Sequence, residues 1–508
     1  MKRKISFILL TTIVVFFGSC EKFLDVNDDP NNVTDVQIIQ LLPSVTVNVG
    51  YLGASDLFRY TSLLAQQFSG HGPNTGFGTF REYERYNIND SDVNNQWVRI
   101  FGTILSDTQL LIDKAEETGN PHYAGVAKLL KAYVYQIVVD SWGDVPYFNA
   151  SQHAENLYPE VDDDEAIYAD LIRLIDDGLA NINAPTSNLS PSQYSTIYTS
   201  NDWPSAREKW EKFGNTLKLR IFLHYSAKDA AFASQQISNL INSGAEFMES
   251  NDDSFEMPFL AQSQRQNPLY SMENGQFRNQ FYPNRFLVDL MNDNDDPRRR
   301  SYFVPFPYDS SPATYRGASF LDIEPSSAYS RIHSYIYGNA SPVDPTRINS
   351  NGSLQDGAIT YSGDGPARLL TYAEYSFIRA EAALLYGAPG NASQFFSEGI
   401  RASMLEAGME QAEIDAYLAA HGTLSGTNEQ QLEQIITEKY VANYAVLVEP
   451  WTDYRRTGYP ALVPHQQPAA IYDEVPRSLP YAQSEINNNP HISQKSSLLE
   501  RVFWDTRQ

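Results

Sequence analysis

Cysteine is almost absent from this chain. Cys20 is the only one among 508 residues, so no internal disulfide can form. The chain also has no Gly-Lys dipeptide and no Gly-x-Ser-x-Gly segment. These absences exclude a P-loop and the nucleophile elbow of α/β-hydrolases. The sequence therefore gives no reason to expect a cofactor.

Basic residues are scarce relative to acidic ones. The chain has 37 Lys and Arg against 62 Asp and Glu, which gives a formal charge of −25. A surface with this charge repels the phosphate backbone of nucleic acids. We therefore expect no nucleic-acid partner.

Metal-binding patterns are scarce as well. No two of the eight histidines are close enough in sequence to form a local zinc pair. The acidic runs at Asp162–Asp164 and Asp293–Asp296 lack the spacing of a calcium loop, and we interpret them as solvated turns and helix caps. No metal site is predicted. A carboxylate pair suited to glycoside cleavage stays an open alternative, because 62 acids offer many pairs.

Only the start of the chain has a positively charged, then apolar, signal-like stretch. Lys2, Arg3 and Lys4 precede the apolar run 5–17, a pattern typical of a secretory signal and too short for a comfortable membrane span. Gly18 and Ser19 then precede Cys20, and small residues before a cysteine are what a lipoprotein signal peptidase recognises. We predict a signal peptide at 1–19 and a tether at 20–35, with lipid on Cys20. The alternative is an incidental cysteine in an ordinary signal peptide. Beyond the signal, no run is predicted to span a membrane.

Aromatic residues, in contrast, are abundant. They make up 13% of the chain, and the 32 Tyr outnumber the 26 Phe. Tyrosine tolerates a wet surface because its ring is apolar and its hydroxyl is polar. A surplus of surface tyrosine suits a face that binds a ligand or a partner.

Apolar residues recur at helical spacing over much of the chain. Trp97 to Ala115 presents one continuous apolar face, and Tyr123 to Val138 repeats the spacing after the break at Gly119-Asn120-Pro121. Two such helices joined by a short turn predict an antiparallel hairpin. The same spacing predicts further helices at 57–68, 164–182, 207–227, 230–243, 369–386, 393–407 and 428–448. Recurring hairpins indicate a mainly α fold of tetratricopeptide-like pairs.

Irregular segments lie between these helices. We predict a single domain at 36–508, with its helical scaffold mainly at 94–245 and 366–458. Insertions rich in Gly, Pro, Ser and Tyr occupy 69–92, 185–206 and 246–365, and a proline-rich tail occupies 459–508. Two stretches of the third insertion, 298–304 and 330–337, are predicted to contribute short strands. The aromatic content argues against disorder in the insertions and the tail.

Several motifs, in order along the chain, resemble the SusD/RagB family of nutrient-binding outer-membrane lipoproteins of Bacteroidetes. Each motif is weak alone, but the ordered set behind a lipidation signal is specific. The motifs are the tether 20–25 with Asp29-Pro30-Asn31-Asn32, Ser141-Trp142-Gly143-Asp144-Val145-Pro146-Tyr147, Trp210 with 213–220, Asp296-Pro297-Arg298, Thr371-Tyr372-Ala373-Glu374 with Ala380-Glu381-Ala382-Ala383, and Trp451 with Arg455-Arg456-Thr457-Gly458-Tyr459-Pro460.

The resemblance implies a function that composition does not reveal. Such proteins are not enzymes. They sit on the cell surface, anchored in the outer membrane, as lids over a SusC-like TonB-dependent barrel transporter, and deliver a nutrient oligomer to it. The ligand is expected to be a glycan, with a peptide as the alternative. A lipid-anchored glycoside hydrolase and a helical scaffold without a small ligand are the rival classes. We interpret the signature residues Trp142, Asn215, Arg220, Arg455 and Arg456 as structural.

The ligand site is sought among aromatic residues outside the packed helices, because burial is harder to complete in loops. Sugars present apolar C–H faces and hydroxyl rims, which suit aromatic planes with amide or carboxylate partners. We predict that two of three loops converge on the ligand. The candidates are Phe77, Phe80 and Tyr83 near the glycine-rich loop, Tyr194, Tyr198 and Trp203 in a polar loop, and Tyr315, Arg316, Tyr335, Tyr337 and Asn339 in the middle insertion.

Overall fold

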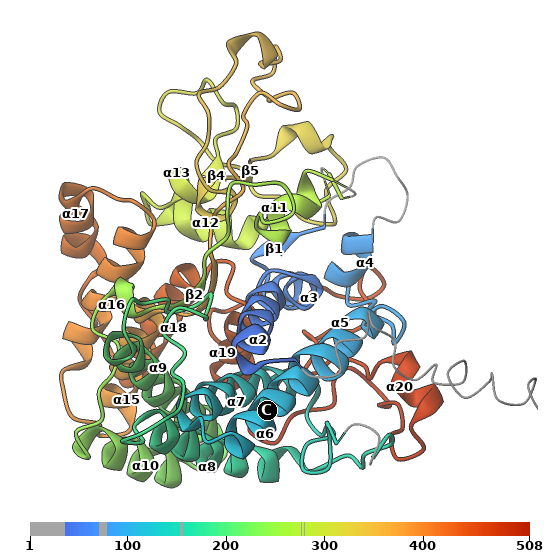
Figure 1. Ribbon diagram of the computed structural model, residues 1–508. Coiled ribbons are helices and arrows are strands. Elements are labelled where there is room, and N and C mark those ends of the chain that lie inside the picture. Colours follow the sequence, from blue (N-terminus) through green and yellow to red (C-terminus); the bar gives the residue numbers. More distant parts are fainter. Residues whose placement is uncertain (1–35, 71–78, 153–155, 276, 279, 508) are drawn as a thin grey trace, which may run out of the picture.

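The structure is a computed structural model that describes residues 36–70, 79–152, 156–275, 277–278 and 280–507. The predicted signal peptide, the tether and Cys20 lie outside these residues. Long helices form the base and one side of the molecule, and short irregular segments form an upper lobe above them (Figure 1). The fold is mainly α-helical with only short strands, as predicted.

The base consists of long helices packed side by side in chain order. α7 packs against α6 and α8, α8 against α9, and α9 against α10. A Cβ atom on Gly125 of α7 would lie only 2.7 Å from the backbone oxygen of Gly178 on α8, so glycine is required where these two helices approach. The helices are α6 (Ser106–Glu117), α7 (Pro121–Trp142), α8 (Asp164–Ile182), α9 (Trp203–His224) and α10 (Ala230–Asn242), and the short 3-10 turns η3 (Tyr225–Ala227) and η4 (Asn251–Asp253) follow α9 and α10.

The first helix of the predicted hairpin, from Trp97 to Ala115, contains a change of helix type. It consists of α5 (Asn94–Arg99), a π-helical segment η1 (Ile100–Leu105) and α6. The chain still runs continuously through all three, and Trp97, Ile104 and Leu111 remain buried. A π-helical turn holds more residues than an α-turn, which the regular spacing of the apolar residues did not reveal.

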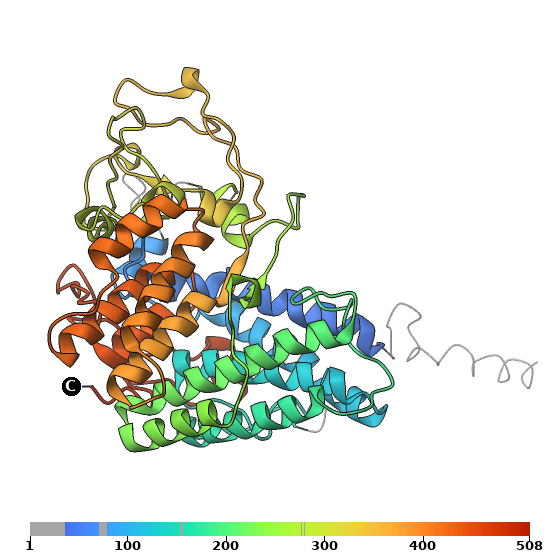
Figure 2. The ribbon, with the colours of Figure 1, turned by 90° about the vertical axis from the view of Figure 1, so that its left-hand side faces the viewer.

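A second group of helices covers one side of the molecule (Figure 2). α15 packs against α16 and α18, and also against α9 of the base. The predicted hairpin at 369–386 and 393–407 is confirmed, but the helix predicted at 428–448 was too long. α18 ends at Ala442, and Ala445 then adopts a left-handed φ of 67° that an α-helix does not allow. The helices are α15 (Tyr372–Leu385), α16 (Ala392–Glu406), α17 (Gln411–His421), α18 (Asn428–Ala442) and α19 (Glu449–Thr457).

The stretch Ile38–Leu64 is long and apolar enough to cross a membrane by composition, with a mean hydropathy of 1.2, contrary to the expectation that no such run follows the signal. It forms two separate helices, α2 (Ile38–Leu52) and α3 (Asp56–Leu64). Leu42, Val45 and Leu57 are fully buried in the main core. The apolar character of this stretch therefore reflects packing inside the protein.

The upper lobe is built from short elements joined by long irregular segments. Three two-stranded antiparallel sheets join segments that are distant in sequence: Phe68 pairs with Pro283, Met257 with Ala367, and Phe303 with Ile332. The strands predicted within 298–304 and 330–337 are present, each next to one turn of helix. The elements of the lobe and its borders are β1 (Phe68–Ser69), α4 (Thr79–Glu84), α11 (Pro268–Glu273), β3 (Tyr282–Pro283), α12 (Arg285–Asp293), α13 (Arg299–Tyr302), β4 (Phe303–Val304), η5 (Ser326–Ala328), β5 (Arg331–Ile332), α14 (Ser334–Tyr337) and η6 (Pro345–Arg347). The paired strands β2 (Phe255–Met257) and β6 (Ala367–Leu370) lie lower, against the helical base, where Phe255 stacks on Phe213 of α9 (Figure 1).

The C-terminal tail packs against the base, and α20 (Gln483–Asn488) is the only helix in its described part, residues 459–507. Trp504 is fully buried, and its indole N–H donates to Asp140 of α7 over 2.9 Å. The indole of Trp142 donates to the carbonyl of Pro480 over 2.8 Å. These contacts explain why a proline-rich segment without regular structure keeps one conformation.

The motif residues that we interpreted as structural are buried in the scaffold. Gly143 ends α7 with a φ of 74°, and Arg220 pairs with Glu374 over 3.2 Å. Arg456 pairs with Glu381 and Asp453, whereas Arg455 lies 3.6 Å from the ring centre of Trp451. Burial outweighs the nearby acids and lowers the pKa of Arg455 to about 10. These residues hold helices together.

Candidate functional site

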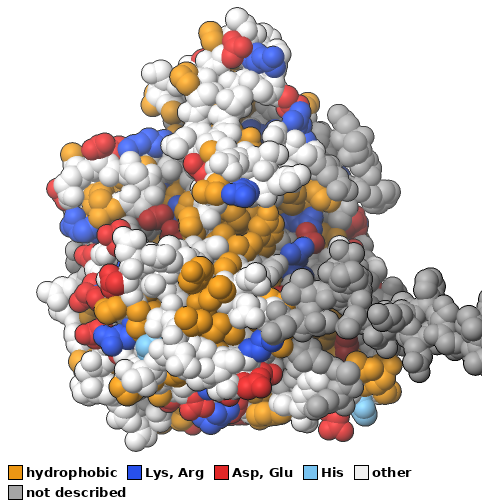
Figure 3. Space-filling view, viewed as in Figure 1, with side chains coloured by type: hydrophobic (Ala, Val, Ile, Leu, Met, Phe, Trp, Pro, Cys, Tyr) orange, Lys and Arg blue, Asp and Glu red, His pale blue; other side chains and the backbone are white. Residues whose placement is uncertain are grey.

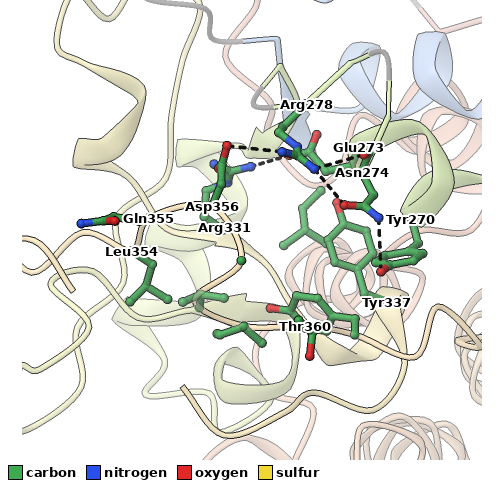
Figure 4. Close-up of a pocket in the computed structure, with 15 residues that line it drawn as sticks. Tyr270, Glu273, Asn274, Arg278, Arg331, Tyr337, Leu354, Gln355, Asp356 and Thr360 are labelled. Atoms are coloured by element: carbon green, nitrogen blue, oxygen red, sulfur yellow. Dashed lines mark hydrogen bonds and ion pairs between the residues drawn. The ribbon is translucent and has the colours of Figure 1, made fainter. Parts of the chain in front are cut away.

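A hollow of about 360 Å³ lies in the upper lobe. Three segments that are far apart in sequence line it: 270–278 at the end of α11, 331–337 in β5 and α14, and 354–361. We call it the tyrosine pocket, after Tyr270, Tyr337 and Tyr361 (Figure 4). Its volume is within the range typical of small-molecule binding sites, about 300–1,000 Å³.

Local hydrogen bonds position these segments. Asn267 caps α11 by accepting from the N–H of Leu269, and its side-chain amide donates to the carbonyl of Gly365 over 2.9 Å. Gly363 has a φ of 77°, and a Cβ there would lie 2.6 Å from the ring of Tyr270. On the opposite wall, the pairing of β4 with β5 places Arg331 and Ile332 at the pocket.

The three tyrosine rings form one cluster. The ring centres of Tyr337 and Tyr361 are 5.3 Å apart, those of Tyr270 and Tyr337 are 5.6 Å apart, and those of Tyr270 and Tyr361 are 6.4 Å apart, all with edge-to-face geometry. Burial raises the pKa of Tyr337 and of Tyr361, so both phenols stay protonated. Tyr337 is nearly buried, whereas Tyr270 and Tyr361 keep part of their rings exposed. The cluster therefore offers aromatic surface from two rings supported by a third.

A half-buried histidine contacts the cluster through Tyr361. Nδ1 of His333 lies 2.8 Å from the hydroxyl of Tyr361. Burial lowers the pKa of His333 to about 4, so the imidazole is neutral at neutral pH. One hydrogen bond therefore fixes the orientation of the Tyr361 ring without adding charge to the pocket.

Polar and charged groups surround the rings. Arg331 forms an ion pair with Glu273, and Nη1 of Arg278 lies 3.5 Å from Oδ2 of Asp356 (Figure 4). Asn274 accepts from Arg278 over 3.1 Å. The side chains of Gln355 and Thr360 also line the hollow. Rings beside amide, hydroxyl and charged groups suit a ligand that has both apolar faces and hydroxyls.

Carboxylate oxygens of Asp144, Asp163 and Asp164 come within 4.8 Å of one another, but these groups have structural roles. Asp144 accepts from the N–H of Asp164, Asp163 caps α8, and Asp164 accepts from the N–H of Phe503. This agrees with the interpretation of 162–164 as a helix cap. The run at 293–296 likewise includes Asp296, which pairs with Arg298 over 2.6 Å.

The candidates near the glycine-rich loop lie next to the pocket but are buried. Phe77 lies outside the described residues. Phe80 is fully buried with its ring centre 5.0 Å from that of Phe277, and Tyr83 donates to Asp92 over 3.1 Å. Phe277 directly precedes Arg278 of the pocket, so Phe80 packs against the segment that forms one wall. In this structure Phe80 has no surface for a ligand.

The candidates of the polar loop do not line the pocket. Tyr194 is 48% exposed, Tyr198 donates to the carbonyl of Asp253 over 2.6 Å, and Trp203 stacks on His122 at the start of α7. Tyr198 and Trp203 thus have partners within the helical base. Their role as ligand residues stays a prediction that no contact with the pocket supports.

Among the candidates of the middle insertion, Tyr337 is the one that lines the pocket. Tyr335 is buried beneath the guanidinium of Arg368, 3.6 Å from its ring centre. Arg299 lies over Tyr315, and Arg316 forms an ion pair with Glu324. Asn339 is exposed, and its carbonyl accepts from the N–H of Ser362.

Sequence reasoning missed Tyr270, Tyr361, Arg278 and Asp356. No local motif marks them, because the pocket forms only when three distant segments meet. The sequence could have indicated only the region that holds the site, because all four residues lie in the tyrosine-rich insertion 246–365.

Comparison with known proteins identifies the family. A family model described as "Starch-binding associating with outer membrane" matches residues 30–482. The chain belongs to the SusD-like family. The resemblance seen in the sequence motifs is thereby confirmed. Among curated proteins, no match to the sequence was found.

Solved structures of SusD-like proteins share the fold. A chitin-binding protein is 22% identical, with a TM-score of 0.74 over 92% of this chain and 99% of that one. A chitin-binding SusD homolog from Flavobacterium johnsoniae is 20% identical, with a TM-score of 0.73 over 93% and 98% of the two chains. A SusD homolog from Bacteroides uniformis is 22% identical, with a TM-score of 0.73 over 92% and 99%. SusD-like proteins are binding proteins that associate with the outer membrane.

Proposed function

We propose that this protein captures an oligosaccharide in the tyrosine pocket at the cell surface and delivers it to a TonB-dependent outer-membrane transporter. The observation that carries the proposal is the cluster of Tyr270, Tyr337 and Tyr361 beside amide and charged groups in one hollow. The family description and the chitin-binding neighbours support a glycan as the ligand class.

Calorimetry with maltohexaose and chitohexaose tests the pocket. Tyr270→Ala and Tyr361→Ala each remove a partly exposed ring, and each should weaken binding by about 1–3 kcal/mol. Tyr194→Ala removes an exposed tyrosine outside the pocket and should leave binding unchanged. Thermal melts run beside each titration separate lost contacts from lost folding. Binding that survives both pocket variants would contradict the assignment.

Membrane attachment is proposed to occur through lipid on Cys20. The support is the lone cysteine directly after a small-residue junction in a family that associates with the outer membrane. Cys20→Ala should leave the protein unprocessed or soluble in the periplasm. Intact mass and detergent partitioning measure the outcome, and a mature mass without acyl chains would contradict it.

Delivery to a transporter rests on family membership. An affinity-tagged copy purified from native membranes in mild detergent should carry a barrel transporter with it, because a lid needs a wide and stable interface. The tyrosine pocket variants serve as controls, since they should retain the partner while losing the glycan. Recovery of the protein alone would count against this step.

A further inference from the structure

The charged side chains in and around the tyrosine pocket occur as matched pairs. Arg331 pairs with Glu273, and Arg278 pairs with Asp356. Just outside, Arg347 lies 3.6 Å from Asp344 and donates to the backbone carbonyl of Asp356 over 2.7 Å. Each arginine therefore has an acidic neighbour, and the pocket carries no net charge from these pairs.

The two pairs that line the pocket differ in how firmly they are held. The guanidinium of Arg331 also lies 4.8 Å from the ring centre of Tyr282, and the Glu273 side chain is only 9% exposed. Arg278 and Asp356 are 49% and 58% exposed, and a single contact of 3.5 Å joins them. The Arg331 side chain is 32% exposed, so Arg278 is the more exposed of the two guanidinium groups, and Asp356 is its acidic partner among the described residues.

We propose that Asp356 makes the pocket selective for uncharged saccharides by neutralising Arg278. A ligand carboxylate or sulfate that approached Arg278 would displace Asp356 and leave two anions beside one cation. A sugar hydroxyl meets no such repulsion, because it can donate to Asp356 while accepting from Arg278. Selectivity then comes from a repulsive group as well as an attractive one. The overall charge of −25 acts in the same direction on anions that approach from solution.

This inference rests on the proposed function, and Asp356→Asn tests it because the substitution keeps the shape and removes the charge. The probes are the neutral hexasaccharide that binds the wild type, maltohexaose or chitohexaose, and a hyaluronan hexasaccharide, whose alternate sugars carry carboxylates. The variant should bind the acidic probe about fivefold more tightly than the wild type at low ionic strength. Binding of the neutral probe should stay within about twofold. The gain in affinity for the acidic probe should disappear at about 0.5 M salt, because the contact between Arg278 and the ligand anion is exposed to solvent.

Two further variants are matched controls. Asp177→Asn makes the same charge change in an exposed pair with Arg173 on α8, and should give no gain. Arg278→Gln combined with Asp356→Asn should abolish the gain, because the proposed anion contact is then absent.

The outcomes separate this inference from the proposed function. If the neutral probe binds and Tyr361→Ala weakens it, but Asp356→Asn gains no acidic binding, the role of Asp356 is wrong and the pocket assignment stands. A wild type that binds both probes equally well would also overturn the inference. If Tyr361→Ala and Tyr270→Ala leave neutral binding unchanged, the pocket assignment itself fails, and the inference with it.

Discussion

The ion pairs that join α15, α18 and α19 of the scaffold differ in exposure from the pair at the mouth of the tyrosine pocket. Arg456, Glu381 and Asp453 are each at most 3% exposed, and they join α19 to α15. Lys439 of α18 is equally buried, 2.8 Å from both Glu449 and Asp453. In the upper lobe, Arg278 and Asp356 are about half exposed. Both charge signs are also scattered over the visible surface of the molecule (Figure 3).

The difference shows that the same types of charged side chain have two roles, one in the buried scaffold and one at the exposed pocket. A buried pair adds little net stability over an apolar pair, but removing one partner leaves a charge without compensation. The scaffold network therefore constrains which helices meet and in what register. An exposed pair is worth about 0–1 kcal/mol and rearranges easily, which suits a surface that meets a ligand.

The largest expected effect comes from breaking the scaffold network. Arg456→Met leaves the buried carboxylate of Glu381 without its cation, while Asp453 keeps Lys439, and should lower the free energy of unfolding by about 3–5 kcal/mol. Urea denaturation measures it. Arg173→Met, in an exposed pair on α8, is the control and should cost less than about 1 kcal/mol. Equal costs for the two variants would remove the distinction between buried and exposed pairs.

A half-buried histidine that has no acidic partner among the described residues extends the comparison to the pH dependence of stability. His224 of the scaffold lies between Asp140 and Glu449, whereas His465 packs against Phe320 and Tyr86. Nε2 of His465 has no hydrogen-bond partner among the described residues. Burial lowers the pKa of His465 to about 4, from about 6.5 in an unfolded chain. Below pH 6.5 the unfolded state therefore binds a proton that the folded state does not, and stability falls as the pH drops toward 4.

His465→Phe should remove this contribution. Between pH 7 and pH 5, the wild type should lose about 2 kcal/mol relative to the variant. Urea denaturation at both pH values gives the difference, which isolates His465 from acids whose raised pKa acts in the opposite direction, such as Glu84 at about 7. His491→Phe, at an exposed position, should change nothing between the two values. A pH-independent difference for His465→Phe would contradict the prediction.

The scaffold could be predicted from sequence because its information is local. The apolar spacing from Asp164 to Ile182 gave both ends of α8, and Gly119-Asn120-Pro121 marked the turn between α6 and α7. Local spacing did not reveal the π-helical turn at Ile100–Leu105 or the end of α18 at Ala442, because backbone dihedrals there are set by tertiary packing.

The candidate site was predictable only as a region. Tyr337 was expected on composition and lies in the pocket, but Tyr335, two residues away, is buried under Arg368. Both are tyrosines in the same loop-rich insertion, and only the meeting of three distant segments decides which one faces a ligand. The pairing of Arg278 with Asp356, 78 residues apart (356 − 278 = 78), follows from that same meeting.

The smallest expected effect concerns an exposed pair that joins the two regions. Nη2 of Arg300 on α13 lies 2.6 Å from Oε2 of Glu413 on α17, with side chains 43% and 35% exposed. The two side chains are well placed for an ion pair, but solvent screens both charges. Arg300→Gln should therefore lower the free energy of unfolding by less than about 1 kcal/mol. The effect should shrink further at about 0.5 M salt, whereas the cost of Arg456→Met should persist because its partners are buried. Urea denaturation of both variants at two salt concentrations makes the comparison directly. A salt-insensitive loss above about 2 kcal/mol for Arg300→Gln would show that the junction between scaffold and lobe behaves like the buried network.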